Sequence, residues 1–208
     1  MDNRFNKVFP SFDPLNPEFA PSYRIIDIFS SHFSFHSFNK HNDNSLLSCS
    51  YQLDNLAIIS LENPLHTFII TDASIRNNVA TFIAYIHIHN RPVIKTLYHV
   101  VNVNSIEAKL FAIRYSINQA TSLYEISKIA IVTNLIYFAK RIFDLLSHLF
   151  QIHAVSILYK LQNFFALNQE NSIEFWEYPS QCNWSLYNEV DKETKLFNPI
   201  PHYLYKLS

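Results

Sequence analysis

The chain has 208 residues, 49% of them apolar, and a formal net charge of −1 at pH 7. This length suits one domain with extensions, and the apolar share is enough to fill one core. The near-zero charge excludes a strongly basic surface, so any contact with nucleic acid depends on local patches. Glycine is absent, which excludes the glycine-rich loops that bind phosphates and dinucleotides.

Residues 1–63 are predicted to be an N-terminal extension that is weakly ordered or the remnant of an upstream domain. This stretch is aromatic and rich in Ser and Asn, lacks sustained periodicity, and is punctuated by Pro10, Pro14, Pro17 and Pro21. The N-terminus lacks an apolar signal core, and the apolar run at 129–139 is too short to span a bilayer. We therefore expect a cytoplasmic or nuclear protein, not a secreted one, that has no membrane partner.

Short apolar runs bounded by turn residues predict five strands, at 66–71, 79–88, 93–101, 128–133 and 172–178. The first three strands are joined by short turns, so we expect them to pair antiparallel. Asn77, Asn78 and Asn90 stand at these turns and can adopt the positive φ that glycine would otherwise supply.

Four helices are predicted between and after the strands. The first begins at Asn104 and places Ile106, Leu110, Ile113 and Ile117 on one apolar face. Two more are expected at 135–150 and 151–167, and Ser185 can cap a last one. The order predicts an α/β fold: a mixed five-stranded sheet, with three antiparallel strands followed by crossover strands, flanked by helices at 64–197. Residues 198–208 are expected to be a C-terminal tail.

Asp72, Glu107, Asn134 and Asp191 form the candidate site. Each stands where a strand ends or in a helix, and the crossover topology is expected to bring Asn134 alongside Asp72. Converging carboxylates repel one another unless cations neutralise them, and hard oxygen ligands suit Mg²⁺. Two such ions can orient an attacking water and stabilise the leaving oxygen of a phosphodiester.

Each of these residues also has a purely structural interpretation. Asp72 can form an Asx turn with Ser74. Glu107 can complete a capping box with Asn104. Asn134 can be the N-cap of the helix that follows. Asp191 can pair with Lys195 at i+4 on a solvated face.

Histidines and cysteines offer weaker alternatives. His87 and His89 share a strand face and His99 lies on the neighbouring strand, but a zinc site would need a further ligand and a supporting shell. Cys49 and Cys182 form no C-x-x-C pair and no disulfide framework. Cys182 has no adjacent base, which argues against a nucleophilic role.

Three ordered segments resemble the type 1 ribonuclease H domain, in the divergent form found at the end of fungal non-LTR retroelement polyproteins. Residues 69–74 (IITDAS) resemble a strand-ending Thr-Asp-Gly-Ser motif. Residues 103–112 resemble the start of the Glu-bearing helix, and residues 175–195 resemble the terminal Trp, Pro-Ser-His and Asn-Glu-x-x-Asp block. Residues 131–134 (IVTN) match the strand that normally ends in Thr-Asp.

The resemblance implies cleavage of the RNA strand of RNA–DNA hybrids with two Mg²⁺ ions. Asp72, Glu107 and Asp191 would be metal ligands and Asn134 the fourth catalytic position. Asn134 replaces a carboxylate, and Gln181 or Cys182 stands near the place of the mobile His of the family. Both departures predict reduced or lost chemistry, so the hydrolase activity is uncertain.

Three hypotheses therefore remain open. The chain is a slow hybrid ribonuclease, an inactive retroelement-derived domain that keeps the fold and at most weak nucleic-acid binding, or an unrelated α/β interaction domain. The departures favour the second hypothesis over the first, and the motif order disfavours the third. From the sequence, Asn134→Asp is expected to restore much of any lost cleavage.

Overall fold

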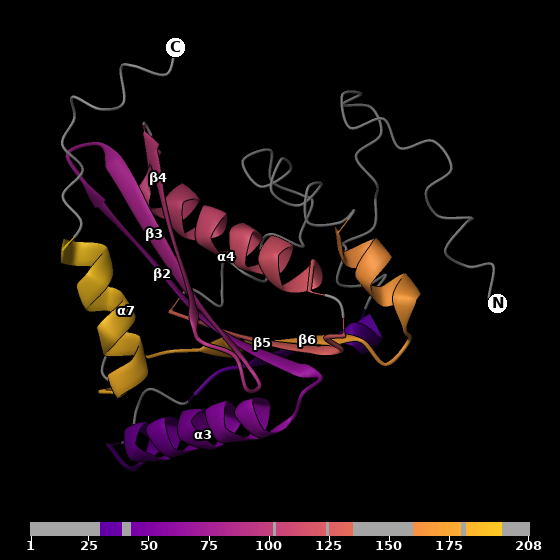
Figure 1. Cartoon of the computed structure of the whole chain (residues 1–208). Helices are drawn as coiled ribbons and strands as arrows, with labels where there is room; N and C mark the ends of the chain where they lie inside the picture. The colour runs from indigo at the N-terminus through magenta and orange to yellow at the C-terminus, as the bar shows by residue number, and fades with distance from the viewer. Residues whose placement is uncertain are drawn as a thin grey trace.

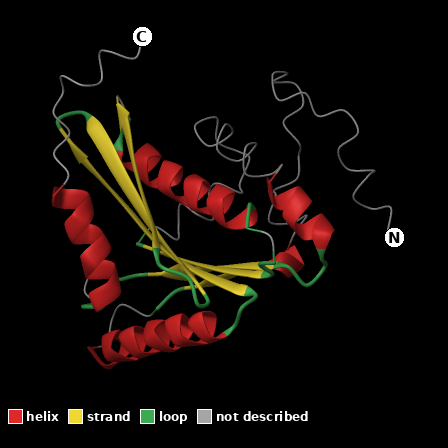
Figure 2. Ribbon diagram, viewed as in Figure 1, coloured by secondary structure: helices red, strands yellow, loops and turns green. Residues whose placement is uncertain are grey.

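The computed structural model describes residues 30–38, 43–101, 103–123, 125–134, 160–179 and 182–196. Figures 1 and 2 show helices on both sides of a twisted sheet. The elements are η2 (Ser30–His32), β1 (Phe33–His36), α3 (Asp43–Glu62), β2 (His66–Arg76), β3 (Val79–Ile88), β4 (Ile94–Val101), α4 (Ser105–Thr121), β5 (Lys128–Thr133), β6 (Ser172–Glu177) and α7 (Ser185–Leu196). Residues 160–167 are also helical. The predicted helix at 135–150, most of the one at 151–167 and the tail at 198–208 lie outside the described residues.

The predicted mixed sheet is confirmed. Its strand order is β1-β6-β5-β2-β3-β4. β2, β3 and β4 pair antiparallel, whereas β5 runs parallel to β2 and β6 runs parallel to β5. Short connections permit antiparallel neighbours, whereas parallel pairing requires a crossover, so the strand directions follow from the spacing of the strands along the chain.

The sheet has six strands instead of five because the predicted extension contributes one. β1 pairs parallel with β6, and the rings of Phe35 and Phe175 stack with centroids 5.2 Å apart. α3 packs on the other face of the sheet, with Cys49 and Leu53 completely buried. Residues 30–38 and 43–62 therefore pack against the same sheet as the rest of the domain, across the boundary predicted at residue 64.

The turn prediction is confirmed at three asparagines. Asn77 and Asn78, between β2 and β3, have φ angles of 51° and 59°, and Asn90, after β3, has 53°. Two consecutive positive φ angles match the hand of turn that suits the twist of an antiparallel hairpin. Asparagine tolerates this region better than other residues with a β-carbon, which explains how a chain without glycine closes these turns.

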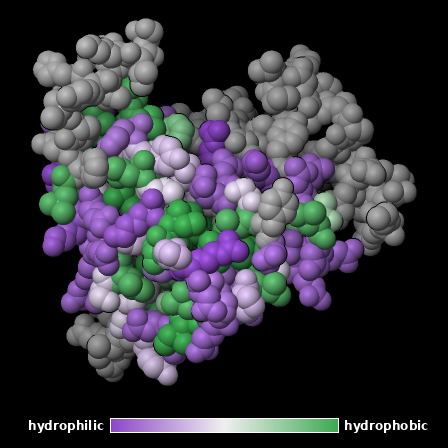
Figure 3. Space-filling model, viewed as in Figure 1, coloured by the Kyte–Doolittle hydropathy of each residue, from purple (hydrophilic) through white to green (hydrophobic). Residues whose placement is uncertain are grey.

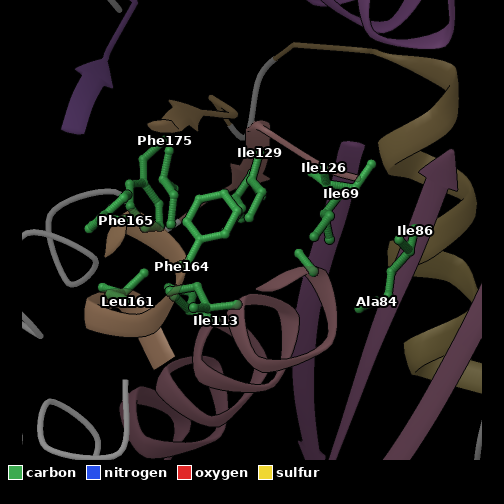
Figure 4. Close-up of a cluster of buried hydrophobic side chains, with 14 of the residues drawn as sticks. Ile69, Ala84, Ile86, Ile113, Ile126, Ile129, Leu161, Phe164, Phe165 and Phe175 are labelled. Carbon is green, nitrogen blue, oxygen red and sulfur yellow. The ribbon is translucent and has the colours of Figure 1, made fainter. Parts of the chain in front are cut away.

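Two helical layers cover the two faces of the sheet. On one face, α4 and the helical residues 160–167 pack against alternate strand residues, among them Ile69, Ile129 and Phe175 (Figure 4). On the other face, α3 and α7 cover Phe68, Ile70 and Val132. Since neighbouring strand residues point to opposite faces, Asp72 lies on the same side as Phe68 and Ile70. Figure 3 shows hydrophobic and hydrophilic side chains interspersed on the visible surface.

Candidate active site

The register of β2 and β5 places Asp72 beside Asn134. Ile70 pairs with Val132, and the same parallel offset carried two residues further aligns Asp72 with Asn134. The side-chain amide of Asn134 donates from Nδ2 to Asp72 Oδ1 at 3.4 Å. The structure thus joins two of the four predicted site residues by a hydrogen bond.

This contact lies at a division in the strand order. β3 and β4 continue the sheet on one side of β2, and β5 and β6 continue it on the other. Ligands of α/β sheets bind outside the carboxyl ends of parallel strands at such a point. β2 does not end at Asp72 as predicted, because it stays paired with β3 as far as Arg76. Because β5 ends at Thr133, only the side of β2 that faces β5 lacks a neighbouring strand beyond this point.

Asp72 is buried, with 5% of its surface exposed. Burial raises the pKa of its carboxyl group, and the charge of Asp191 acts in the same direction; the N–H of Ala73 and the ammonium of Lys109 oppose the rise. The buried phenol of Tyr187 on α7 also interacts with this carboxylate. Burial and the charge of Asp72 raise the pKa of Tyr187.

Lys109 on α4, like Tyr187, is a residue at this site that the sequence interpretation missed. Its Nζ donates to Asn134 Oδ1 at 3.1 Å. The amide of Asn134 therefore accepts from a cation through its oxygen and donates to a carboxylate through its nitrogen, which suits both of its ends. One signal was present in the sequence: Lys109 stands between two apolar residues, Ala108 and Leu110.

Glu107 forms the capping box that was its structural alternative. The N–H of Asn104 donates to Glu107 Oε2 at 2.9 Å, and the N–H of Glu107 donates to Asn104 Oδ1 at 2.9 Å. Residues two apart on a helix lie on different sides of it. Lys109 contacts Asn134, whereas the hydrogen bonds of Glu107 are those of the N-terminus of α4.

Asp191 is held near the site by the packing of α7. Val190 is completely buried, and Ser74 Oγ on β2 donates to the carbonyl of Thr194 at 2.9 Å. Asp191 lies close enough to raise the pKa of Asp72. Its carboxylate makes an i,i+4 ion pair with Lys195 at 2.5 Å, which was its structural alternative.

The side chains in this arrangement do not fit a pair of Mg²⁺ ions. In the described part of the chain, no three His, Cys, Asp or Glu side chains gather closely enough to hold a metal ion. The amide oxygen of Asn134 accepts from Lys109, and the carboxylate of Glu107 accepts from the main chain. A metal role for Asp72, Glu107 and Asp191 stays a prediction.

The histidines and cysteines make separate contacts. His99 Nδ1 lies 3.0 Å from Thr81 Oγ1, and His89 Nδ1 lies 2.5 Å from the carbonyl of Leu61. Cys49 and Cys182 are both buried. Burial raises the pKa of each thiol, which disfavours the thiolate that a nucleophile requires.

Asp72→Asn is expected to raise the free energy of unfolding at pH 7 by about 1 kcal/mol. An acid whose pKa is raised by folding contributes stability below its unfolded value, and this contribution is lost as pH rises through the folded pKa. At pH 7 the burial of this carboxyl group therefore destabilises the fold. Urea denaturation should show the gain at pH 7 and a smaller gain near pH 4.

Asp191→Asn is the matched control, because 36% of the Asp191 side chain is exposed. Its effect should stay within about 0.5 kcal/mol. A loss of stability in Asp72→Asn at pH 7 would show that its partners outweigh the cost of burial.

No family model matches the sequence, and no curated protein is similar to it. Among solved structures, RNase H1 from the halophilic archaeon Halobacterium salinarum has a TM-score of 0.46 and 11% identity, over 62% of this chain and 96% of that one. A foamy viral protease-reverse transcriptase in complex with double-stranded DNA has a TM-score of 0.44 and 12% identity, over 64% of this chain and 92% of that one. At such identities, activity has to be argued from the side chains of this chain.

Proposed function

We propose that this chain is a retroelement-derived, ribonuclease H-like domain that binds RNA–DNA hybrid or another nucleic acid weakly, with impaired or lost cleavage. The observation that carries the proposal is the contact of Asp72, within β2, with Asn134, directly after the carboxyl end of β5. Its position at the division of the strand order supports a ligand site. The predicted mixed sheet and the order of the three sequence segments support the same ancestry.

The charges around this site support weak binding. Lys109 and Lys195 are both already engaged, by Asn134 and by Asp191. Phosphate contacts supply most of the affinity for nucleic acid without sequence preference. None of the helices in the described ranges has both the length and the apolar character of a membrane span.

A Mg²⁺-dependent nuclease that cleaves the RNA strand is the second candidate. Asp72 and Asp191 favour it, because both carboxylates lie at the same edge of the sheet and interact electrostatically. It requires Glu107 to leave its capping box and Lys109 to leave Asn134 before two ions can bind.

Fluorescence anisotropy with a labelled RNA–DNA hybrid tests the proposal. In EDTA the chain is expected to bind with a Kd of about 10–100 μM, and the affinity should fall as salt rises. Lys195→Ala should weaken binding. Arg91→Ala is the matched control, since the turn after β3 lies at the opposite end of β2 from Asp72.

Equal affinity of the Lys195→Ala variant and of the parent chain for the hybrid would show that nucleic acid does not bind beside Asp72 and Asp191. Binding that appears only with Mg²⁺, accompanied by cleavage of the RNA strand, would favour the second candidate instead.

A further inference from the structure

Lys109, Asn134 and Asp72 form a continuous chain of contacts from an ammonium through an amide to a carboxylate. The two hydrogen bonds measure 3.1 Å and 3.4 Å. The three side chains come from α4, from the residue after β5 and from β2. Main-chain pairing therefore fixes two members, and the third reaches them from a helix packed on the sheet.

Asparagine is suited to this place because its amide has both a donor and an acceptor. Its N–H faces a carboxylate and its carbonyl oxygen faces an ammonium. A carboxylate at position 134 would turn an oxygen toward Asp72 and repel it. Asparagine at position 134 therefore satisfies both Asp72 and Lys109.

Each of the two aspartates at this site already has a lysine partner. Lys195 is paired with Asp191, and the charge of Lys109 acts on Asp72. An incoming divalent cation would meet an ammonium at the oxygen of Asn134, and like charges repel strongly at such short range.

We infer that Lys109 is a built-in counterion that replaces a divalent cation beside Asp72 and Asn134, and that it determines whether this edge can bind metal. This inference depends on the proposed function only for the location of the site. It concerns ion binding, whereas the proposed function concerns nucleic acid, so either can fail while the other holds.

Thermal unfolding of the full chain in EDTA, MgCl₂ and MnCl₂ tests the inference. The parent chain and Asn134→Asp should show the same Tm in all three, because in the variant the new carboxylate pairs with Lys109. Lys109→Gln combined with Asn134→Asp removes this cation and leaves carboxylates together. Its Tm should rise by about 3–5 °C at an ion concentration near ten times Kd.

Two further variants control for charge and for folding. Lys192→Gln combined with Asn134→Asp removes an exposed lysine of α7 and should give no ion-dependent shift. Lys109→Arg combined with Asn134→Asp keeps the charge and should also give none. Isothermal titration with Mg²⁺ at 25 °C provides a second readout if a double variant melts at low temperature.

A Mg²⁺-dependent rise in the Tm of the parent chain, or of Asn134→Asp alone, would overturn the inference. The same holds if the Lys109→Gln double variant is folded and binds no ion in the titration. A shift of equal size in the Lys192→Gln double variant would show that net charge, and not the position of Lys109, controls binding.

Discussion

Leu53→Ala is expected to lower the free energy of unfolding by about 2–5 kcal/mol, the usual cost of emptying a packed core position. Leu53 is completely buried and belongs to the core cluster that joins α3 to Phe68 and Trp184. The indole of Trp184 is fixed in this cluster by its hydrogen bond to Asp54 Oδ1 at 2.8 Å. Urea denaturation monitored by circular dichroism measures the change.

Ile59→Ala is the matched control, because it removes an apolar side chain from the solvent side of the same helix. Ile59 is 56% exposed, so its loss should change the free energy of unfolding by less than about 0.5 kcal/mol. If both variants leave stability unchanged, α3 is an appended helix and the domain begins near residue 64, as the sequence alone suggested.

The sequence predicted the central strands well because their apolar residues are continuous and their turns are marked. Nearly every residue of β3 is buried. Its continuous apolar run therefore predicts a strand even when the strands that it pairs with are unknown. β1 was missed because it has four residues, all half-buried. α3 was missed because Ile58 and Ile59 are apolar but exposed, which obscures the helical period.

The site was predictable in part, for the same physical reason. The parallel register of β2 and β5 places Asp72 beside Asn134, as the crossover topology suggested. Side-chain direction on a helix is less apparent from sequence. Glu107 and Lys109 differ by two positions, and only the packing of α4 decides which of them faces Asn134.

Lys109→Glu combined with Asn134→Asp is expected to give the largest gain in cleavage of a labelled RNA–DNA hybrid, about 10²–10⁴-fold over the parent chain. Such a gain corresponds to about 3–5 kcal/mol of transition-state stabilisation. Asn134→Asp alone should gain less than about tenfold, because its new carboxylate would be neutralised by Lys109. This differs from the expectation from sequence, in which Asn134→Asp alone restores much of any lost cleavage.

The two substitutions place acidic side chains at the positions of an amide and an ammonium that now contact each other at 3.1 Å. With Asp72 and Asp191 unchanged, the edge would then carry four carboxylates and could attract divalent ions from solution. Adding Asp72→Asn to the double variant should abolish the gain. If Asn134→Asp alone equals the double variant, Lys109 does not oppose metal binding. If every variant is folded and none cleaves the hybrid, changes other than Asn134 and Lys109 have abolished the ancestral activity. Nucleic-acid binding alone then remains as the proposed function.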